Sequence, residues 1–374
     1  MNRRYVSTIA AALLLAAAVA SAAAPAKSTK PAAKPAAATT AKPATGKPKV
    51  IIVATGGTIA GAAASQTEAG YQSGAVGVDL LIQAVPQLKD LADVTGEQIA
   101  SIGSQDMNDA VWLKLGKRVN ELLARPDVAG VAITHGTDTM EETSYFLNLV
   151  VHSDKPVVLT GSMRPSTAMS ADGPLNIYNA VAIAADPKAR GRGVLVTVDD
   201  DIHSGHDIVK THTTDVGTMS SGEAGLVGAT LFGKNTWFRT PSAVHTKASE
   251  FSIDGVSTLP RVDIIYAHAN MSPDIITSAV QNGAKGLVIA GVGDGNMTAP
   301  AVEALKGAIA QGVVVVRSSR TNGGIIRRNI ELNDDQLGTV ASMELNPAKA
   351  RVLLQLALLK TKDPKTIQGY YDRY

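Results

Sequence analysis

Short apolar runs rich in β-branched residues alternate along this chain with longer segments whose apolar residues recur every three or four positions. The runs predict buried strands, and the longer segments predict amphipathic helices. Strands are expected at residues 50–54, 128–134, 156–160 and 193–198. Helices are expected at residues 108–124, 139–151 and 173–185, with Asn108 as the N-cap of the first. This alternation is typical of a mostly parallel sheet with helices on both faces.

The alternation lapses in a polar stretch that contains Pro241 and Pro260, and then it resumes. Further strands are expected at residues 262–266, 286–290 and 312–316, and further helices at residues 274–282, 299–311 and 347–359. We therefore expect an α/β protein with two α/β domains. The larger N-terminal domain (49–240) has a mostly parallel sheet flanked by helices. A connector (241–260) leads to a smaller C-terminal parallel-sheet domain (261–374).

The first 48 residues do not share this pattern. Arg3-Arg4 precedes an Ala- and Leu-rich run that ends near position 24, and Ala20-Ser21-Ala22 fits an A-x-A cleavage site. A membrane anchor is the alternative, but the apolar centre of the run is shorter than the roughly 20 residues that a membrane span needs. We expect a cleaved signal peptide (1–24), an Ala/Pro/Lys-rich tether (25–48) that cannot bury a core, and an exported protein without a stable membrane anchor.

Charge and cysteine content exclude several classes of function. Seven of the 35 Lys and Arg residues lie in the first 47 positions, which contain no acidic residue. The remainder has 28 basic against 33 acidic residues, a net charge of about −5, which argues against a nucleic-acid-binding body. The chain has no cysteine, so disulfides and thiolate metal sites are excluded.

The first predicted strand stops abruptly at Gly56-Gly57, and Thr58 follows. Glycine allows the backbone to turn where a side chain would clash. Thr58 is thereby placed just past the carboxyl end of a strand, where open α/β sheets bind ligands. An ordinary strand-to-loop turn is the alternative interpretation of these residues.

Three further loops gather polar groups near strand or helix ends. Residues 133–139 follow the second predicted strand, and residues 101–106 precede a helix N-terminus, a natural site for an anion. Residues 61–77, which include Tyr71, are rich in Gly, Ala and Ser. That loop is too long and polar to belong to the core and suits a mobile lid.

Several common catalytic motifs are absent from the sequence. It contains no G-x-S-x-G elbow, no H-E-x-x-H and no Walker A pattern. Residues 291–296 follow an apolar strand but lack the G-x-G-x-x-G spacing of an NAD site. Of the seven histidines none falls in a recognisable triad or metal motif, and His135 is interpreted as structural.

Lys210 could activate a hydroxyl if burial or nearby charge lowered its pKa; otherwise it is an exposed surface lysine. Asp138, beside Thr137, could equally be the N-cap of the helix that begins there. A nucleophilic hydroxyl needs its proton removed and its product oxyanion stabilised. From the residues alone, the chain is either a hydrolase with a hydroxyl cluster or an amino-acid-binding protein.

Taken together, the motifs resemble the bacterial L-asparaginase family, specifically the exported type II asparaginase and glutaminase-asparaginase group. The matching stretches occur in family order at residues 54–61 (ATGGTIAG), 103–109 (GSQDMND), 134–143 (THGTDTMEET), 163–166, 170–174, 210–215 (KTHTTD), 317–320 and 349–354. The resemblance extends from residue 49 to the C-terminus, so that only the signal peptide and the tether fall outside it.

The resemblance implies the catalytic residues Thr58, Tyr71, Thr137, Asp138, Lys210 and Glu331. Thr58 would be the nucleophile. Tyr71, on the lid, would contact the Thr58 hydroxyl, with Glu331 in support. Thr137, Asp138 and Lys210 would form a second cluster of hydroxyl, acid and lysine. The alternatives are that Tyr71 only orders its loop and that Glu331 belongs to a charged surface stretch.

The resemblance also implies the substrate-binding residues Ser104, Gln105, Asp138 and Asn296. Ser104 and Gln105 would hold the α-carboxylate and α-amino ends of an amino-acid amide, and Asp138 would pair with the ammonium. Asn296 and Glu331 would reach into the site of a neighbouring subunit, which implies a homotetramer with shared sites. Asp294 stands where many members of the family have asparagine.

The activity implied is hydrolysis of L-asparagine to L-aspartate and ammonia through a threonine acyl-enzyme, with L-glutamine as a second candidate substrate. No metal, no cofactor and no nucleic-acid partner are expected, and the location implied is periplasmic or secreted. The alternative is an exported amino-acid-binding protein without catalysis. A third hypothesis is an amidase subunit that acts on a charged RNA. The export signal and the acidic body argue against it.

Overall fold

The larger of two sheets carries the strands predicted in the first half of the chain. The computed structural model describes residues 46–68 and 70–374, so the predicted signal peptide and most of the tether lie outside the described residues. The sheet has the strand order β12-β11-β8-β7-β6-β5-β1-β4. Its strands are β1 (Lys49–Gly56), β4 (Asp93–Ile102), β5 (Val128–Thr134), β6 (Val157–Thr160), β7 (Val194–Val198), β8 (Asp201–Ser204), β11 (Gly228–Leu231) and β12 (Lys234–Trp237).

Strands β4, β1, β5, β6 and β7 are parallel, and β8, β11 and β12 continue the sheet in antiparallel pairing. The expectation of a mostly parallel sheet is therefore confirmed. The sequence pattern missed β4 because this edge strand is only half-buried along its length and has no continuous apolar run. Its exposed residues alternate with partly covered ones instead.

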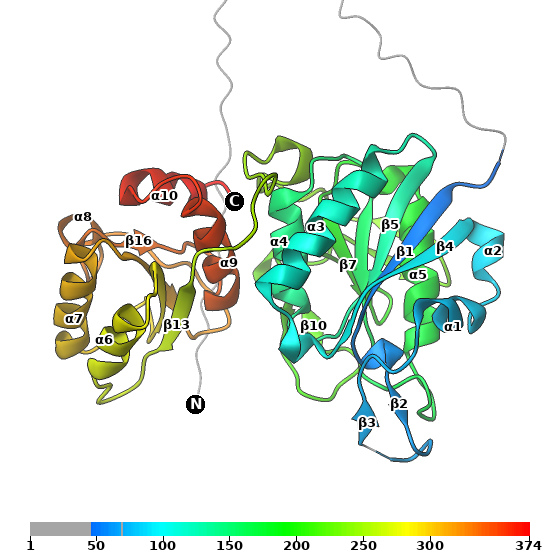
Figure 1. Cartoon of the computed structure of the whole chain (residues 1–374), viewed down its shortest axis with the longest axis horizontal. Helices are drawn as coiled ribbons and strands as arrows, with labels where there is room; N and C mark the ends of the chain where they lie inside the picture. Colours follow the sequence, from blue (N-terminus) through cyan, green and yellow to red (C-terminus); the bar gives the residue numbers. More distant parts are fainter. Residues whose placement is uncertain (1–45, 69) are drawn as a thin grey trace, which may run out of the picture. The chain divides into compact units, whose positions relative to one another are not determined.

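Helices cover both faces of this sheet (Figure 1). They are α1 (Val78–Gln83), α2 (Leu88–Leu91), α3 (Asp109–Ala124), α4 (Met140–Val150) and α5 (Gly173–Ala185). Successive residues of β1 serve the two faces, as the twofold period of a strand requires. Ile51 and Val53 pack with α3 and α4, whereas Val50 and Ile52 pack with α1, α2 and α5. The predicted N-cap is present, since the Asn108 side chain accepts a hydrogen bond from Val111 N at 3.2 Å.

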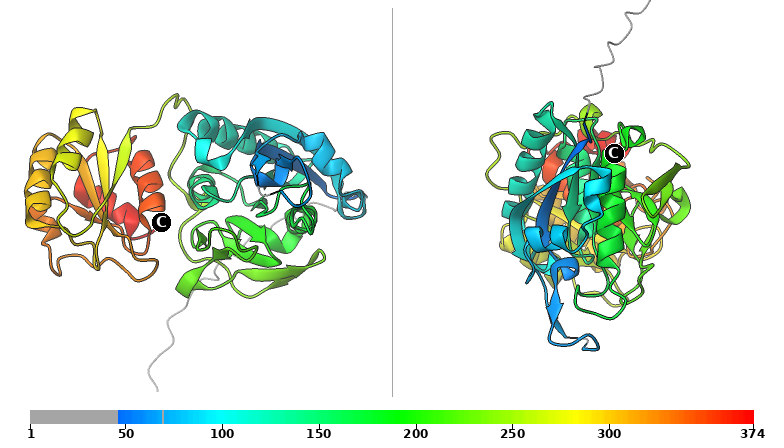
Figure 2. Two further views of the ribbon diagram at one scale, coloured as in Figure 1. Left: turned by 90° about the horizontal axis from the view of Figure 1, so that it is seen from below. Right: turned by 90° about the vertical axis from the view of Figure 1, so that its right-hand side faces the viewer.

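The smaller sheet lies wholly in the C-terminal part of the chain, and its four strands are parallel. They are β13 (Val262–Tyr266), β14 (Gly286–Gly291), β15 (Val314–Ser319) and β16 (Val340–Ala341). Helices α6 (Asp274–Gln281) and α7 (Ala299–Ala310) pack on one face, and α9 (Pro347–Ala357) and α10 (Pro364–Tyr371) on the other. In the left view of Figure 2 the yellow and orange strands lie between these helix layers.

Direct contacts join the helices next to the two sheets. The Tyr145 hydroxyl in α4 donates to the Tyr374 carbonyl at 2.7 Å, and both residues belong to one continuous buried cluster with the α9 residue Leu353. The polar stretch 241–260 contains only a single short 3₁₀ turn, Thr246–Ala248. No helix in residues 46–68 and 70–374 is both long and apolar enough to cross a lipid bilayer.

Two short hairpins lie outside the sheets. Strands β2 (Ala62–Ala63) and β3 (Tyr71–Gln72) pair within the predicted lid, so this loop is partly ordered by backbone pairing rather than structureless. Figure 1 shows this hairpin beyond the carboxyl end of β1. Strands β9 (Val209–Lys210) and β10 (Met219–Ser220) form the second hairpin and carry Lys210.

Candidate active site

The Gly56-Gly57 turn joins the carboxyl ends of three strands. Gly57 N donates to the Ile102 carbonyl at the end of β4, at 2.8 Å. Gly57 has a φ of +82°, and a Cβ there would overlap the backbone of Gly136, which follows β5. Glycine is needed at this point both for the positive φ and for the close approach. Gly57 and Gly136 therefore lie in contact. Thr58 directly follows the first of these glycines, and Thr137 directly follows the second.

Thr58 forms the first hydroxyl pair. The Thr58 side chain is 8% exposed, and its Oγ1 lies 2.6 Å from Tyr71 Oη. Tyr71 comes from β3, and its ring packs against Gly61. A Cβ on Gly61 would lie only 2.7 Å from Tyr71 Cδ2. A glycine at position 61 therefore leaves room for the tyrosine ring. The hairpin brings together the two residues that the sequence assigned to the nucleophile and the lid.

Lys210 binds both members of the second predicted cluster. Lys210 Nζ donates to Thr137 Oγ1 at 2.9 Å and to Asp138 Oδ1 at 2.6 Å. The lysine side chain is only 17% exposed, so the alternative of a free surface lysine is wrong. Helix α4 has Thr139 as its N-cap residue, and Asp138 is directed to Lys210, so the N-cap interpretation of Asp138 is also wrong.

Two residues that the sequence reasoning left without a role hold this cluster in place. Glu141 Oε2 accepts a hydrogen bond from Lys210 N at 2.9 Å, and Glu141 Oε1 accepts one from Asn346 Nδ2 at 3.1 Å. The Thr137 hydroxyl also donates to Met163 Sδ at 3.3 Å. Glu141 and Met163 both lie within stretches that match the family, and this was the available signal.

Ser104 packs against the loop that carries Asp138. Ser104 is 4% exposed, and its Oγ accepts from Asp138 N at 3.2 Å. The Thr139 hydroxyl donates to the Ser104 carbonyl at 2.8 Å. Gln105, the next residue, is exposed. The two loops after β4 and β5 therefore meet, and the buried Ser104 hydroxyl lies beside Asp138.

His135 is a buried, neutral residue between these loops. It is completely buried, and its Nδ1 lies 2.6 Å from the Gly136 carbonyl oxygen. Burial lowers the pKa of His135 to about 4, although the hydrogen bond to Gly136 acts in the opposite direction. The imidazole is therefore uncharged at neutral pH, in keeping with the structural role expected for it.

Asn296 and Glu331 form a separate pair in the C-terminal part of the chain. Asn296 Nδ2 donates to Glu331 Oε2 at 2.6 Å, and Glu331 is exposed. Among the described residues, neither side chain hydrogen-bonds to Thr58 or Lys210. The structure thus brings seven of the predicted site residues to the carboxyl ends of β1, β4 and β5, and it pairs the other two elsewhere.

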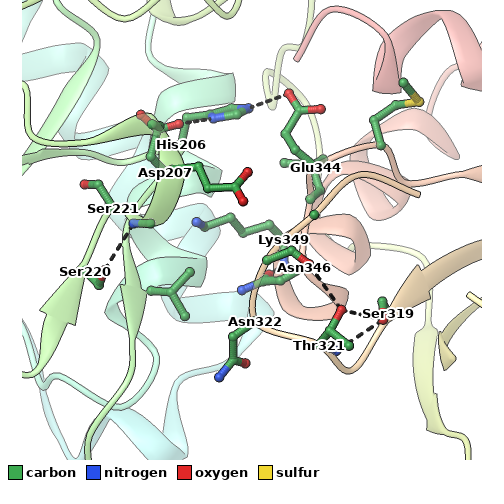
Figure 3. Close-up of a pocket in the computed structure, with 18 of the residues that line it drawn as sticks. His206, Asp207, Ser220, Ser221, Ser319, Thr321, Asn322, Glu344, Asn346 and Lys349 are labelled. Carbon is green, nitrogen blue, oxygen red and sulfur yellow. Dashed lines mark hydrogen bonds and ion pairs between the residues drawn. The ribbon is translucent and has the colours of Figure 1, made fainter. Parts of the chain in front are cut away.

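A separate cavity of about 160 Å³ is lined by residues other than the predicted site residues. Figure 3 shows His206, Asp207 and Glu344 on its wall, with Lys349 pointing into it. Lys349 is 2% exposed, and its Nζ donates to the Ile208 carbonyl. Burial lowers the pKa of Lys349 to about 8. Within residues 46–68 and 70–374, no group of three or more His, Asp or Glu side chains is placed to hold a metal ion.

Comparison with known proteins matches this chain over both of its sheets. The family model described as Asparaginase, N-terminal, covers residues 49–243, and the Glutaminase/Asparaginase C-terminal domain covers residues 261–371. The chain is 51% identical over 327 residues to L-asparaginase 2 of Escherichia coli, covering 87% of this chain and 93% of that protein. It is 50% identical over 327 residues to a probable periplasmic L-asparaginase of Haemophilus influenzae, with the same coverage.

The chain is also similar to a glutaminase-asparaginase and to a solved asparaginase structure. The chain is 48% identical over 327 residues to the glutaminase-asparaginase of Pseudomonas fluorescens biotype A, covering 87% of this chain and 90% of that protein. The crystal structure of a probable cytoplasmic L-asparaginase from Campylobacter jejuni superposes with a TM-score of 0.85 at 46% identity, covering 88% of this chain and 100% of that one. The chain therefore belongs to the asparaginase family.

Proposed function

We propose that this protein hydrolyses L-asparagine to L-aspartate and ammonia and that L-glutamine is its second candidate substrate. The observation that carries the proposal is the bonding of Lys210 Nζ to both Thr137 Oγ1 and Asp138 Oδ1, beside the Thr58–Tyr71 pair. Membership of the asparaginase family supports it. A binding protein would need the amino-acid pocket but not two paired hydroxyls, one of them held by a lysine.

Thr58 is the proposed nucleophile. Its Oγ attacks the carboxamide carbon, the C–N bond breaks, and ammonia leaves with the proton that the hydroxyl gives up. Tyr71 Oη, at 2.6 Å, is placed to relay that proton: it takes the Thr58 proton while it gives its own to the leaving nitrogen. Water then attacks the resulting ester, which releases L-aspartate and restores the Thr58 hydroxyl. The Lys210 ammonium and the Thr137 hydroxyl supply a proton donor and a positive charge for the second step.

The substrate is a zwitterion and needs complementary groups at both of its charges. We assign Ser104 and Gln105 to the α-carboxylate and α-amino ends, and Asp138 to the ammonium. Asp138 can do this while it is bonded to Lys210, because only its Oδ1 takes that bond and its side chain is 59% exposed. Asn296 and Glu331 are assigned to a neighbouring subunit's site, within a homotetramer.

Export to the periplasm or the medium is proposed from residues 1–24, whose pattern is that of a cleaved signal. One relative is named periplasmic, whereas the protein of the similar crystal structure is named cytoplasmic. Fractionation of cells that express the full chain tests the assignment. Recovery of a shortened chain in the periplasm or medium supports export, and recovery of the full-length chain in the cytoplasm refutes it.

Ammonia release by the purified protein tests the activity. Time courses with L-asparagine and with L-glutamine give kcat/KM for each, while light scattering after gel filtration gives the subunit number. Turnover of L-asparagine supports the enzyme, and binding without ammonia release supports the amino-acid-binding alternative. The two substrates differ by one methylene, which is worth about 1–3 kcal/mol in a pocket, so a preference of roughly 10- to 200-fold in either direction is accessible.

A further inference from the structure

Arg317 and Asp334 form a buried ion pair in the C-terminal part of the chain. Arg317 lies in β15 and is 1% exposed, and Asp334 starts α8 (Asp334–Leu337) and is completely buried. Arg317 Nε donates to Asp334 Oδ1 at 2.7 Å, and Nη2 donates to Asp334 Oδ2 at 2.8 Å. Desolvation of two charges is costly, and a buried ion pair is weak evidence for stability by itself. Its remaining hydrogen bonds indicate what the pair does.

The Arg317 guanidinium also holds two backbone segments. Its Nη1 donates to the Asp294 carbonyl at 3.0 Å, and its Nη2 to the Arg327 carbonyl at 3.3 Å. The turn after β14 packs directly on the guanidinium, because a Cβ on Gly295 would lie 3.0 Å from Arg317 Nη1. A second tie joins the same segments, since Asp294 Oδ1 accepts from Arg327 N at 3.0 Å.

The Asp334 carboxylate fixes the far side of the same loop. Its Oδ2 accepts from Asn329 N at 3.0 Å, and its Oδ1 accepts from the Thr339 hydroxyl at 2.6 Å. Asn329 has a φ of +56°, a left-handed conformation that asparagine adopts more readily than most other residues. The ion pair is therefore the centre of a hydrogen-bond network. This network joins β15 to the turn after β14, to residues 327–329 and to the start of α8.

Asn296 and Glu331 lie on two of the segments that the Arg317–Asp334 network joins. Asn296 is two residues after Asp294, whose carbonyl is bound by Arg317. Glu331 lies between Asn329 and Asp334, both of which belong to the network. The two side chains meet across the segments, with Asn296 Nδ2 donating to Glu331 Oε2 at 2.6 Å. Glu331 is itself exposed, so little packing surrounds its carboxylate. The Asn296 backbone is paired with Val292, and the buried network holds the turn between them and the backbone on both sides of Glu331.

We propose that Arg317 and Asp334 are positioning residues that preassemble the Asn296–Glu331 pair for the active site to which it contributes. The proposal rests on the proposed function, because it takes Asn296 and Glu331 as parts of an asparagine-hydrolysing site. A preorganised donor and acceptor need no rearrangement when substrate binds. A fork of two parallel hydrogen bonds requires a guanidinium, and a lysine in its place cannot reproduce that geometry.

The test uses Arg317→Lys and Asp334→Asn in the full-length assembled protein. Displacement of the pair by about 1 Å should lower kcat/KM for L-asparagine by roughly 10- to 100-fold. The loss should divide between KM and kcat in the same proportion as in an Asn296→Ala variant. Arg118→Lys is the matched control, because Arg118 makes a similar two-bond pair with Glu97 in the other sheet's domain. We expect the control to stay within twofold of wild type.

The decisive readout is the effect of Arg317→Lys in an Asn296→Ala/Glu331→Ala background. If Arg317 acts through those two residues, the added substitution should change kcat/KM by less than threefold there. An equal fold-loss in both backgrounds would show general structural damage and overturn the proposal. Thr339→Val, which removes one hydrogen bond from Asp334, provides the same comparison if the charged variants do not fold.

The two proposals fail in different ways. Wild-type protein that releases no ammonia from L-asparagine overturns the proposed function, and the positioning proposal falls with it. Active wild-type protein whose Arg317→Lys variant keeps its kcat/KM within twofold overturns the positioning proposal alone. Thermal unfolding and gel filtration on each variant establish that folded, assembled protein is compared.

Discussion

Replacement of Lys210 by methionine removes the charge that links Thr137 to Asp138 while it keeps most of the apolar stem. Lys210 Nζ makes one hydrogen bond to a neutral hydroxyl and one to a carboxylate, at 2.9 and 2.6 Å. A hydrogen bond to a charged group contributes about 1.5–3 kcal/mol. Because the Asp138 side chain is 59% exposed, solvent screening reduces this, and we expect a loss of only about 1–2 kcal/mol in unfolding free energy.

The effect of Lys210→Met on catalysis should be much larger than its effect on stability. Loss of a positioned proton donor lowers rates by about 10²- to 10⁴-fold. Ammonia release from L-asparagine measures the loss, and thermal unfolding shows that the variant is folded. Lys117→Met is the matched control, since among residues 46–68 and 70–374 Lys117 Nζ donates only to the Val256 carbonyl, at 2.7 Å. A Lys210→Met enzyme within threefold of wild-type kcat/KM would refute the role assigned to this lysine.

Two further predictions concern ionisation and backbone packing. Burial raises the pKa of Glu142 from 4.5 to about 7, despite Arg351 nearby. The folded protein therefore binds this proton more tightly than the unfolded chain does. The resulting contribution to the free energy of unfolding is complete below pH 4.5, and it is lost as the pH rises through about 7. Glu142→Gln should flatten that decline in unfolding temperature between pH 5 and 8, and an unchanged slope would contradict the assignment. Gly57→Ala should destabilise by about 2–3 kcal/mol or prevent folding, because its Cβ overlaps Gly136. Gly77→Ala, in open space, should be tolerated, and equal denaturation midpoints for the two would be contrary evidence.

The strands that carry the site could be predicted because their burial is recorded in their residues. β1, β5, β6 and β7 are buried on both faces and are continuous apolar runs in the sequence. The strand β4 could not be found in this way. It lies at the edge of the sheet, where half-exposed residues carry no strong pattern. The turn Gly56-Gly57 was recognisable because few residues other than glycine adopt its positive φ.

The resemblance to the family could name the candidate site residues, but their contacts could not be read from the sequence. Lys210 is 73 positions from Thr137, and no local pattern predicts that their side chains meet. Asp138 has two local options, an N-cap or an ion pair, and only the position of Lys210 decides between them. Glu141 was missed for the same reason, because its two partners come from β9 and from the start of α9.

The pairing of Asn296 with Glu331 depends on a network that is not local in sequence. Arg317 lies 21 positions after Asn296 and 14 before Glu331, and it holds both through backbone carbonyls and Asp334. A buried arginine in a strand gives no distinctive periodicity. The sequence match at residues 317–320 identified the segment, and the geometry supplied its partners.

Ammonia release by a Thr58→Ala variant tests the central claim most directly. The Thr58 hydroxyl has Tyr71 Oη as its hydrogen-bond partner, and alanine fits the same space, so the fold should be retained. We predict that the variant is folded and still binds L-asparagine but releases no ammonia above about 10⁻³ of the wild-type rate. Activity near that of wild type would contradict the account and would move the nucleophile elsewhere, with Thr137 as the first residue to test.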